Sequence, residues 1–322
     1  MKDRVGNPVV TGENLLHIPA VETHLIRSKH VQQIFKIQVM QPAGRKGDTR
    51  RYPVVYVTDG NWVFDMFKSI SYLLQMSADD APPFILVGIS YPSDSPHAGG
   101  RLRLRDNTFP PFPQFDVKSM PEFLKKTLSL NSYEGTLLPE EGAKDFYGAE
   151  DFRSFIGAEL VPFIDQKYET IPSDRTYFGH SGGGFFGLFT LFTQPDLFKN
   201  YLISSPGLLY HGMAPGGMKY ENYDCGLQMA RTFVETGKSL NGIKLYMSVG
   251  AEEEYERAMG PWQLISGFYQ FAKFMKNAAI SGLELMTEVF PNETHITVWP
   301  TAFIHGVQVA LGTRRVVRSV YY

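Results

Sequence analysis

The chain has 322 residues, of which 43% are hydrophobic and 20% charged, a balance that supports a packed interior and excludes a disordered chain. Its 31 basic and 33 acidic residues leave a net charge of -2, so nothing favours binding to a nucleic acid or an anionic membrane. Cys225 is the single cysteine, which excludes an internal disulfide and a thiolate metal cluster and fits a reducing compartment.

Signals for secretion or membrane insertion are missing from the sequence. The stretch from Met1 to Ala20 carries charges at Lys2, Asp3 and Arg4 but no apolar signal-peptide core, and no run reaches about 18 uninterrupted apolar residues. We therefore expect a cytoplasmic protein with no membrane partner. The sequence has no H-E-x-x-H motif and no tight cluster of His and Asp, so we expect neither a metal nor a cofactor. Homo-oligomerisation stays open.

Short apolar runs that end in Gly, Asp or Ser recur along the chain and predict its strands. These runs are Ile34–Met40, Val54–Thr58, Phe84–Ser90, Thr176–Gly179, Tyr201–Ser204, Lys244–Val249 and Leu283–Phe290. Most have consecutive apolar residues, as strands buried on both faces of a parallel sheet do. Amphipathic helical patterns lie between them, for example Phe152–Ile164, which Pro162 should kink. The alternation predicts a single α/β domain over residues 1–322, with a doubly wound, mainly parallel sheet flanked by helices.

Residues 92–150 interrupt this alternation. They are rich in Pro, Phe, Gly and Arg, with no strong strand pattern and only a short helix expected near Pro121–Leu130. A connection of this length is typical of an active-site lid, and its aromatic residues favour a packed lid over a mobile segment. We therefore expect a lid-like insertion within the domain.

Gly179–Gly183 reads Gly-His-Ser-Gly-Gly and matches G-x-S-x-G, in which glycines let a strand turn sharply into a helix with serine at the apex. A β-prone run, Arg175–Phe178, leads into the motif, and the apolar stretch Gly184–Phe192 follows it as a buried helix would. These flanks predict Ser181 as a catalytic nucleophile. The structural alternative is a glycine-rich turn whose serine caps the helix.

A serine hydroxyl needs a base, and in this fold the base follows the nucleophile along the chain. Three histidines follow Ser181. His295 comes after a predicted strand end and a short polar loop, a position that presents a side chain to a catalytic site. His305 lies in a predicted helix, and His211 lies in a loop after a strand, where it could line a pocket. We prefer His295 as general base.

The acid of a catalytic triad should lie between the serine and the histidine. The predicted strand Leu245–Gly250 runs into Ala251–Glu254, which contains three adjacent glutamates. A carboxylate there would fix the tautomer of the imidazole and stabilise the imidazolium ion. Glu253 is the first choice and Glu252 the second, while Glu254 stays open. The alternative is an acidic, solvated turn with the base oriented by another group.

Backbone N–H groups should form an oxyanion hole for the negative oxygen that develops in acyl transfer. Gly182, directly after the nucleophile, is the first expected donor. The loop after an early strand supplies the second, because Gly60 permits close approach of a ligand to the backbone. Asn61 is preferred there over Trp62. Trp62 is either a wall of the substrate pocket or core, and Asp59 is expected to tie down the loop.

Several motifs occur in the order found in one known family. They are Thr58-Asp59-Gly60-Asn61, Leu160-Val161-Pro162-Phe163-Ile164, Gly179-His180-Ser181-Gly182-Gly183, Ser204-Ser205-Pro206-Gly207 and Glu293-Thr294-His295. With them the chain, except its lid segment, resembles the Putative esterase family of α/β-hydrolases, which includes esterase D, enterochelin-type siderophore esterases and antigen-85 acyltransferases. The resemblance implies that Ser181 and His295 are catalytic and that the amides of Asn61 and Gly182 form the oxyanion hole.

Arg103–Thr108 resembles a family segment written Arg-Asp-Tyr-Thr-Pro near the mouth of the active site. Here Asn107 replaces the aromatic residue and the proline comes later, a departure that bears on substrate preference. Arg105, or else Arg103, is a candidate for binding an acidic group of the substrate. Pairing of an arginine with Asp106 is the alternative.

The nucleophile motif, a late histidine and an intervening carboxylate together predict a serine esterase that acts on a small-molecule ester through an acyl-enzyme. An acyltransferase would use the same triad and hand the acyl group to an alcohol instead of water. A non-catalytic binding protein on a hydrolase scaffold is the third reading, although no triad position is broken in the sequence.

Overall fold

The computed structural model describes residues 19–42, 49–77, 79–92, 100–109, 147–213, 219–257 and 259–312. Of the predicted lid, residues 92–150, most positions lie outside these ranges, as does the helix expected near Pro121–Leu130. The lid therefore stays a prediction. The described part of that segment contains α2 (Gly100–Asn107), a helix that the sequence pattern did not predict.

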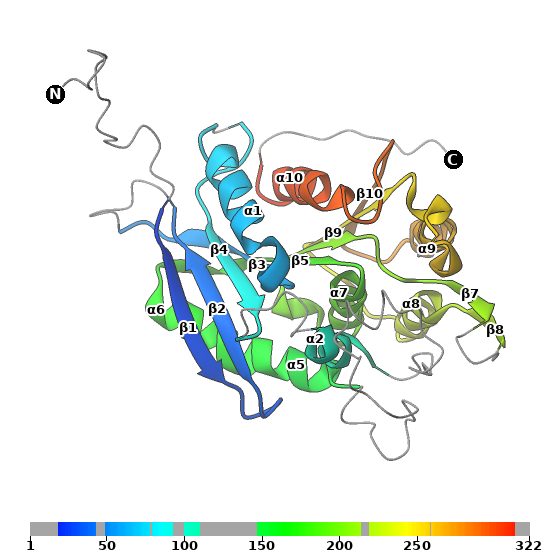
Figure 1. Ribbon diagram of the computed structural model, residues 1–322, viewed down its shortest axis with the longest axis horizontal. Coiled ribbons are helices and arrows are strands. Elements are labelled where there is room, and N and C mark those ends of the chain that lie inside the picture. Colours follow the sequence, from blue (N-terminus) through cyan, green and yellow to red (C-terminus); the bar gives the residue numbers. More distant parts are fainter. Residues whose placement is uncertain are drawn as a thin grey trace, which may run out of the picture.

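A single large sheet organises the described residues, with eight strands in the order β1-β2-β4-β3-β5-β6-β9-β10 (Figure 1). The strands are β1 (Val21–Arg27), β2 (Ile34–Met40), β3 (Tyr52–Val57), β4 (Ile85–Ser90), β5 (Thr170–His180), β6 (Asn200–Ser204), β9 (Ile243–Gly250) and β10 (Leu283–Phe290). From β4 to β10 every neighbouring pair is parallel, while β1 and β2 add on in antiparallel fashion. The mainly parallel α/β sheet predicted from the apolar runs is confirmed.

The sequence patterns did not predict three of the strands. β1 lies at the edge of the sheet with half-exposed residues alternating along it, so it has no continuous apolar run. β7 (Tyr210–Met213) and β8 (Lys219–Tyr223) form a separate antiparallel pair outside the main sheet. By contrast, β3, β4 and β6 are buried along their whole length, which is why their sequences are nearly all apolar.

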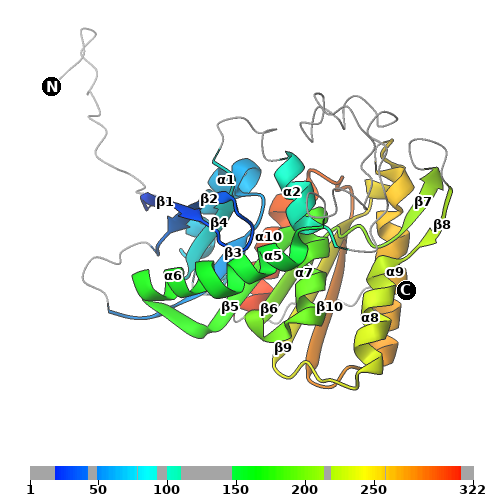
Figure 2. The same cartoon turned by 90° about the horizontal axis from the view of Figure 1, so that it is seen from below.

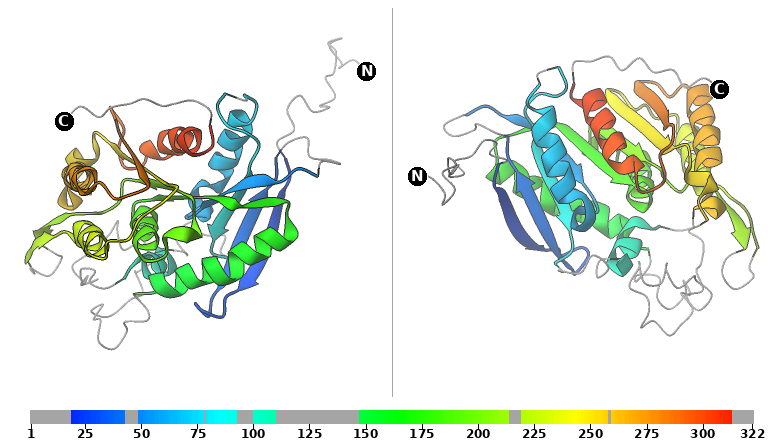
Figure 3. Two further views of the ribbon diagram at one scale, coloured as in Figure 1. Left: turned by 180° about the vertical axis from the view of Figure 1, so that it is seen from behind. Right: turned by 45° about the horizontal axis from the view of Figure 1, so that its top comes forward.

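Helices cover both faces of the sheet. On one face lie α1 (Gly60–Leu74) and α10 (Val298–Ala310), which pack together above the strands (Figure 3, right). The other face carries α5 (Ala149–Phe155), α6 (Val161–Lys167), α7 (Gly182–Thr193), α8 (Cys225–Glu235) and α9 (Leu264–Ala278) (Figure 2). Short 3-10 turns occur at Pro195–Leu197, Glu253–Tyr255 and Gly260–Trp262. The two apolar layers explain the burial of the central strands on both sides.

The sequence predicts a kink at Pro162, and the structure has a π-helical turn just before this residue. Ile156–Leu160 is π-helical between α5 and α6, and the Val161 N–H donates to the carbonyl of Ile156, five residues earlier. Proline has no N–H to continue the ordinary hydrogen-bond ladder, and a wider turn just before it accommodates the interruption. The helix then continues to Lys167.

The contact between α1 and α10 provides a test of this packing. Phe67 is fully buried, stacks on Phe303 at 4.0 Å between ring centroids, and meets Phe178 edge-on. We expect Phe67→Ala to lower the free energy of unfolding by about 3–5 kcal/mol in urea titrations, because it removes a core ring and leaves a cavity. Leu73→Ala on the same helix, where Leu73 is 61% exposed, should cost about 0.5 kcal/mol or less. Equal losses from the two variants would contradict this packing.

Candidate active site

Ser181 stands at a sharp turn between β5, which ends at His180, and α7, which begins at Gly182. Its backbone has φ 55° and ψ -120°, a conformation that a non-glycine residue adopts only when the surroundings hold it. The Ser181 N–H donates to the Ser204 carbonyl at 2.9 Å, which ties the turn to the end of β6. A Cβ at Gly179 would lie 2.3 Å from the Gly183 carbonyl oxygen, so a glycine is required there. This strand–turn–helix is the geometry of a nucleophile elbow.

His295 and Glu253 meet at the same edge of the sheet, although they lie 42 positions apart in the sequence. The His295 Nδ1 is 2.7 Å from Glu253 Oε2, and the Glu253 side chain is fully buried. A carboxylate only accepts, so Nδ1 carries the proton and the other ring nitrogen, Nε2, is the one able to accept. The His295 ring packs 4.4 Å from the ring of His180, the residue before Ser181. Thus the structure brings the predicted base, acid and nucleophile motif together.

Three further groups, to which the sequence pattern assigned no role, support the base and the acid. Ser205 Oγ donates to Glu253 Oε1 at 2.6 Å, and the Gly250 N–H donates to the same oxygen at 2.6 Å. The Glu256 carboxylate accepts from the backbone N–H of His295 at 2.7 Å. A signal for Ser205 was available, because it directly follows β6, whose neighbours β5 and β9 lead to Ser181 and Glu253. Glu256 has no comparable signal.

Two of the rival candidates, Glu254 and His305, have other partners. The two oxygens of Glu254 accept from the N–H and the hydroxyl of Ser266, at the start of α9, and the Glu252 side chain is exposed. His305 lies in α10, as predicted, and its Nδ1 is 3.0 Å from Glu288. His211 belongs to β7, not to a loop as expected, and its side chain lies outside the described part of the structure.

The loop after β3 carries the second predicted oxyanion donor. The Trp62 N–H donates to the Asp59 carbonyl at 2.9 Å, so it is engaged within the helix start. The Asn61 N–H lies one residue nearer the start of α1, too early in the helix to have an intrahelical acceptor. The side chain of Asn61 exchanges two hydrogen bonds with the backbone of Tyr91, at 2.7 and 2.9 Å, which fixes its residue in place. This geometry favours Asn61 over Trp62 as a donor.

The two candidate arginines both have carboxylate partners. Arg105 Nε is 2.7 Å from Asp106 Oδ1, the alternative that the sequence left open, so binding of substrate by Arg105 stays a prediction. Arg103 Nε is 2.5 Å from Asp59 Oδ1, and its guanidinium lies over the ring of Trp62 at 5.2 Å. Trp62 is half-buried and faces Trp299 at 6.4 Å between ring centroids. Asp59 therefore ties the loop to α2, as expected.

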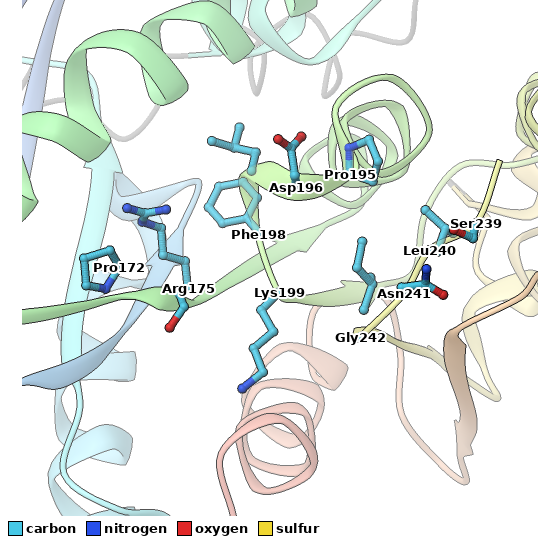
Figure 4. Close-up of a pocket in the computed structure, with 13 residues that line it drawn as sticks. Pro172, Arg175, Pro195, Asp196, Phe198, Lys199, Ser239, Leu240, Asn241 and Gly242 are labelled. Carbon is cyan, nitrogen blue, oxygen red and sulfur yellow. The ribbon is translucent and has the colours of Figure 1, made fainter.

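One hollow among the described residues is remote from these groups. A cavity of about 320 Å³ lies where β5, β6 and β9 begin, and its lining includes Arg175, Pro195, Lys199 and Asn241 (Figure 4). Ser181 follows the opposite end of β5. Ligands of open parallel α/β sheets bind beyond the carboxyl ends of the strands, so this cavity lies at the opposite edge from the expected ligand site.

Within the described ranges, no three His, Cys, Asp or Glu side chains gather closely enough to hold a metal ion. None of the helices in the same ranges is both long enough and apolar enough to cross a membrane.

His180 offers a test of how the site is buried. Burial lowers the pKa of its imidazole well below the ordinary 6.5, and the nearby His295 and Arg103 lower this pKa further. The ring is therefore neutral in the folded protein and takes up a proton more readily in the unfolded chain, so acid below about pH 6.5 favours unfolding.

We expect the free energy of unfolding to fall as the pH drops from about 7.5 to about 5. In His180→Asn the slope of this fall should be smaller than in the wild type by up to about 1.4 kcal/mol per pH unit. Urea titrations at several pH values would measure both slopes. A constant loss of stability in the variant cancels in this comparison. Parallel pH profiles would contradict the assignment of a buried, neutral His180.

Comparison with known proteins identifies the family. The model of the Putative esterase family matches residues 129–308. The ferri-bacillibactin esterase BesA of Bacillus subtilis is 26% identical over 300 residues, 92% of each chain. The BES protein of Bacillus cereus has a TM-score of 0.69 at 25% identity over 93% of this chain and 99% of that one. A siderophore hydrolase of Aspergillus nidulans, EstB, has the same fold, with a TM-score of 0.72 at 20% identity over 94% and 99% of the two chains. The chain therefore belongs to the Putative esterase family, has the α/β-hydrolase fold and is an esterase.

Proposed function

We propose that this esterase hydrolyses carboxylic esters through an acyl-enzyme on Ser181, with His295 as general base and Glu253 as the acid that orients it. The observation that carries the proposal is the 2.7 Å contact between His295 and the buried Glu253 carboxylate, beside a strained serine turn. A nucleophile, an orienting acid and a base in this chain order are the recurrent solution for acyl transfer in α/β-hydrolases.

The first half of the reaction forms the acyl-enzyme. His295 Nε2 takes the Ser181 proton as Oγ attacks the ester carbonyl, and the carbonyl oxygen becomes an oxyanion. The N–H groups of Gly182 and Asn61 donate to that oxygen. When the tetrahedral intermediate collapses, the carbon–oxygen bond to the alcohol breaks and His295 returns the proton to the departing alcohol.

The second half releases the acid. His295 removes a proton from water, the resulting hydroxide attacks the acyl carbonyl, and Ser181 leaves with the proton from His295. Glu253 stabilises the imidazolium form of His295 in both halves. The Ser205 hydroxyl and the Gly250 N–H donate to its Oε1, which holds the buried carboxylate beside the imidazole.

Esters of siderophores are the substrates we infer for this site. Curated relatives are named for ferri-bacillibactin, triacetylfusarinine C and enterobactin, which supports this class over simple lipid esters. A substrate screen should therefore compare siderophore lactones with aryl esters and with acyl esters of increasing chain length.

Loss of the proposed nucleophile or base gives the first test. Ser181→Ala and His295→Ala should each lower kcat by about 10³-fold or more on an ester that the wild type cleaves, because these groups act as one unit. Labelling by a fluorophosphonate probe should vanish in Ser181→Ala. Activity retained in either variant would remove that residue from the mechanism.

Matched variants separate these effects from general damage. His305→Asn and Glu252→Gln change the rival histidine and the rival glutamate and should leave kcat within about threefold, while Glu253→Gln should lower it by about 10³-fold or more through the wrong histidine tautomer. The opposite ranking of the two glutamates would transfer the acid role to Glu252.

The acyl acceptor needs a separate measurement. We expect the free acid to remain the main product when a short alcohol is added at about tenfold excess over the ester, because water is the proposed nucleophile in the second step. Chromatographic analysis of products would measure the ratio of acid to new ester. A predominance of the new ester would establish the acyltransferase reading instead.

A further inference from the structure

Arg103 connects the two loops that hold the proposed oxyanion donors. Its Nε and Nη2 bind the two oxygens of Asp59 at 2.5 and 3.0 Å, and Nη2 also donates to the carbonyl of His180 at 3.2 Å. The third nitrogen, Nη1, lies 3.1 Å from the position that a Cβ on Gly182 would take. A single guanidinium on α2 therefore contacts the loop after β3 and the turn after β5.

The contacts fall at equivalent places in the two loops. Asp59 lies two residues before Asn61, and His180 lies two residues before Gly182. Each contact is therefore close in the sequence to a proposed donor. Both loops also contain a residue held at positive φ, Asp59 at 62° and Ser181 at 55°. Such backbone conformations cost free energy and persist only where tertiary contacts hold them. The guanidinium supplies one such contact for each loop.

Arg103 and Asp59 form a buried ion pair. The side chains of Arg103 and Asp59 are 13% and 4% exposed. Burial lowers the pKa of Arg103, but the charge and hydrogen bonds of Asp59 outweigh burial and leave the pKa above its ordinary value. Removing one partner of a buried pair leaves an uncompensated charge, so the pair is maintained as a unit.

We propose that Arg103 is a positioning residue for the ester reaction: it fixes the loops after β3 and β5 relative to each other, so that the Asn61 and Gly182 amides converge on one oxygen. The inference rests on the proposed acyl-enzyme mechanism. Arg103 acts through the two amides and does not itself touch the substrate. Its planar fork can bind Asp59 at two points while reaching the His180 carbonyl, and a lysine ammonium cannot reproduce that fork.

The test compares Arg103→Met, Arg103→Lys and Arg175→Met in the full chain. Arg175 lies earlier on the same strand as His180 and forms a comparable part-buried ion pair with Asp165, but at the far edge of the sheet, so it is the matched control. For each variant we would measure kcat and KM on an aryl ester, the inhibition constant of a trifluoromethyl ketone that adds to the serine, and the thermal midpoint. The ketone adduct carries an oxyanion, so its affinity reports on the amides directly.

We expect Arg103→Met to lower kcat by about 100-fold with KM changed less than about threefold, and to weaken the ketone by the same factor as kcat/KM. The kcat of Arg103→Lys should exceed that of Arg103→Met by less than about tenfold. Arg175→Met should leave kcat and ketone affinity within about threefold of wild type, even if its thermal midpoint falls as far as that of Arg103→Met. If Arg103→Met does not fold, the same pattern is expected for Arg103→Lys, with a smaller factor.

The inference would be overturned if ketone affinity and kcat were unchanged in the Arg103 variants. It would also be overturned if Arg175→Met reduced both quantities as much as Arg103→Met does. The proposed function fails differently: in that case the wild type itself would form no serine adduct with the ketone. A wild-type adduct together with insensitive Arg103 variants would therefore remove only the role of Arg103.

Discussion

The backbone turn at Ser181 is the constraint around which the described site is built. A strand at the centre of the sheet reverses into a helix within one residue, at φ 55°, a conformation that costs about 1–3 kcal/mol. Only small neighbours permit it: a Cβ at Gly183 would lie 2.5 Å from the Thr58 hydroxyl, and one at Gly179 would strike the Gly183 carbonyl. The hydrogen bond from the Ser181 N–H to Ser204 and the burial of α7 on the sheet offset the cost.

Buried charges around this turn are each matched by partners. The Glu253 carboxylate receives donors from Ser205, Gly250 and His295, and the Asp59 carboxylate receives two from Arg103. Unmatched, each charge would destabilise the fold severely, so the partners and the fold depend on one another. In the proposed mechanism, this arrangement keeps the N–H donors to the oxyanion fixed before a substrate arrives, which is the condition for stabilising an oxyanion without reorganisation.

Local sequence patterns predicted the central strands and the helix after Ser181, because continuous apolar runs are a direct consequence of burial on both faces. Elements outside the central sheet strands were missed, namely the edge strand Val21–Arg27, the separate strand pair Tyr210–Met213 and Lys219–Tyr223, and the helix Gly100–Asn107. The helix through Pro162 was predicted with an irregularity but not with its π-helical form, since the alternative ways of absorbing a missing N–H look alike in a sequence.

By itself the sequence determined the glycine-flanked turn at Ser181 and the chain order of serine, glutamates and histidine, because tight turns restrict residue type and chain order is read directly. Only the tertiary structure decided which partners meet. Glu253 reaches His295 while its neighbour Glu254 turns to Ser266, since adjacent residues of a 3-10 turn point in different directions. Arg103 and Arg105 likewise separate onto different partners, because residues two apart on a helix face opposite sides, and spacing alone cannot say which side faces the site.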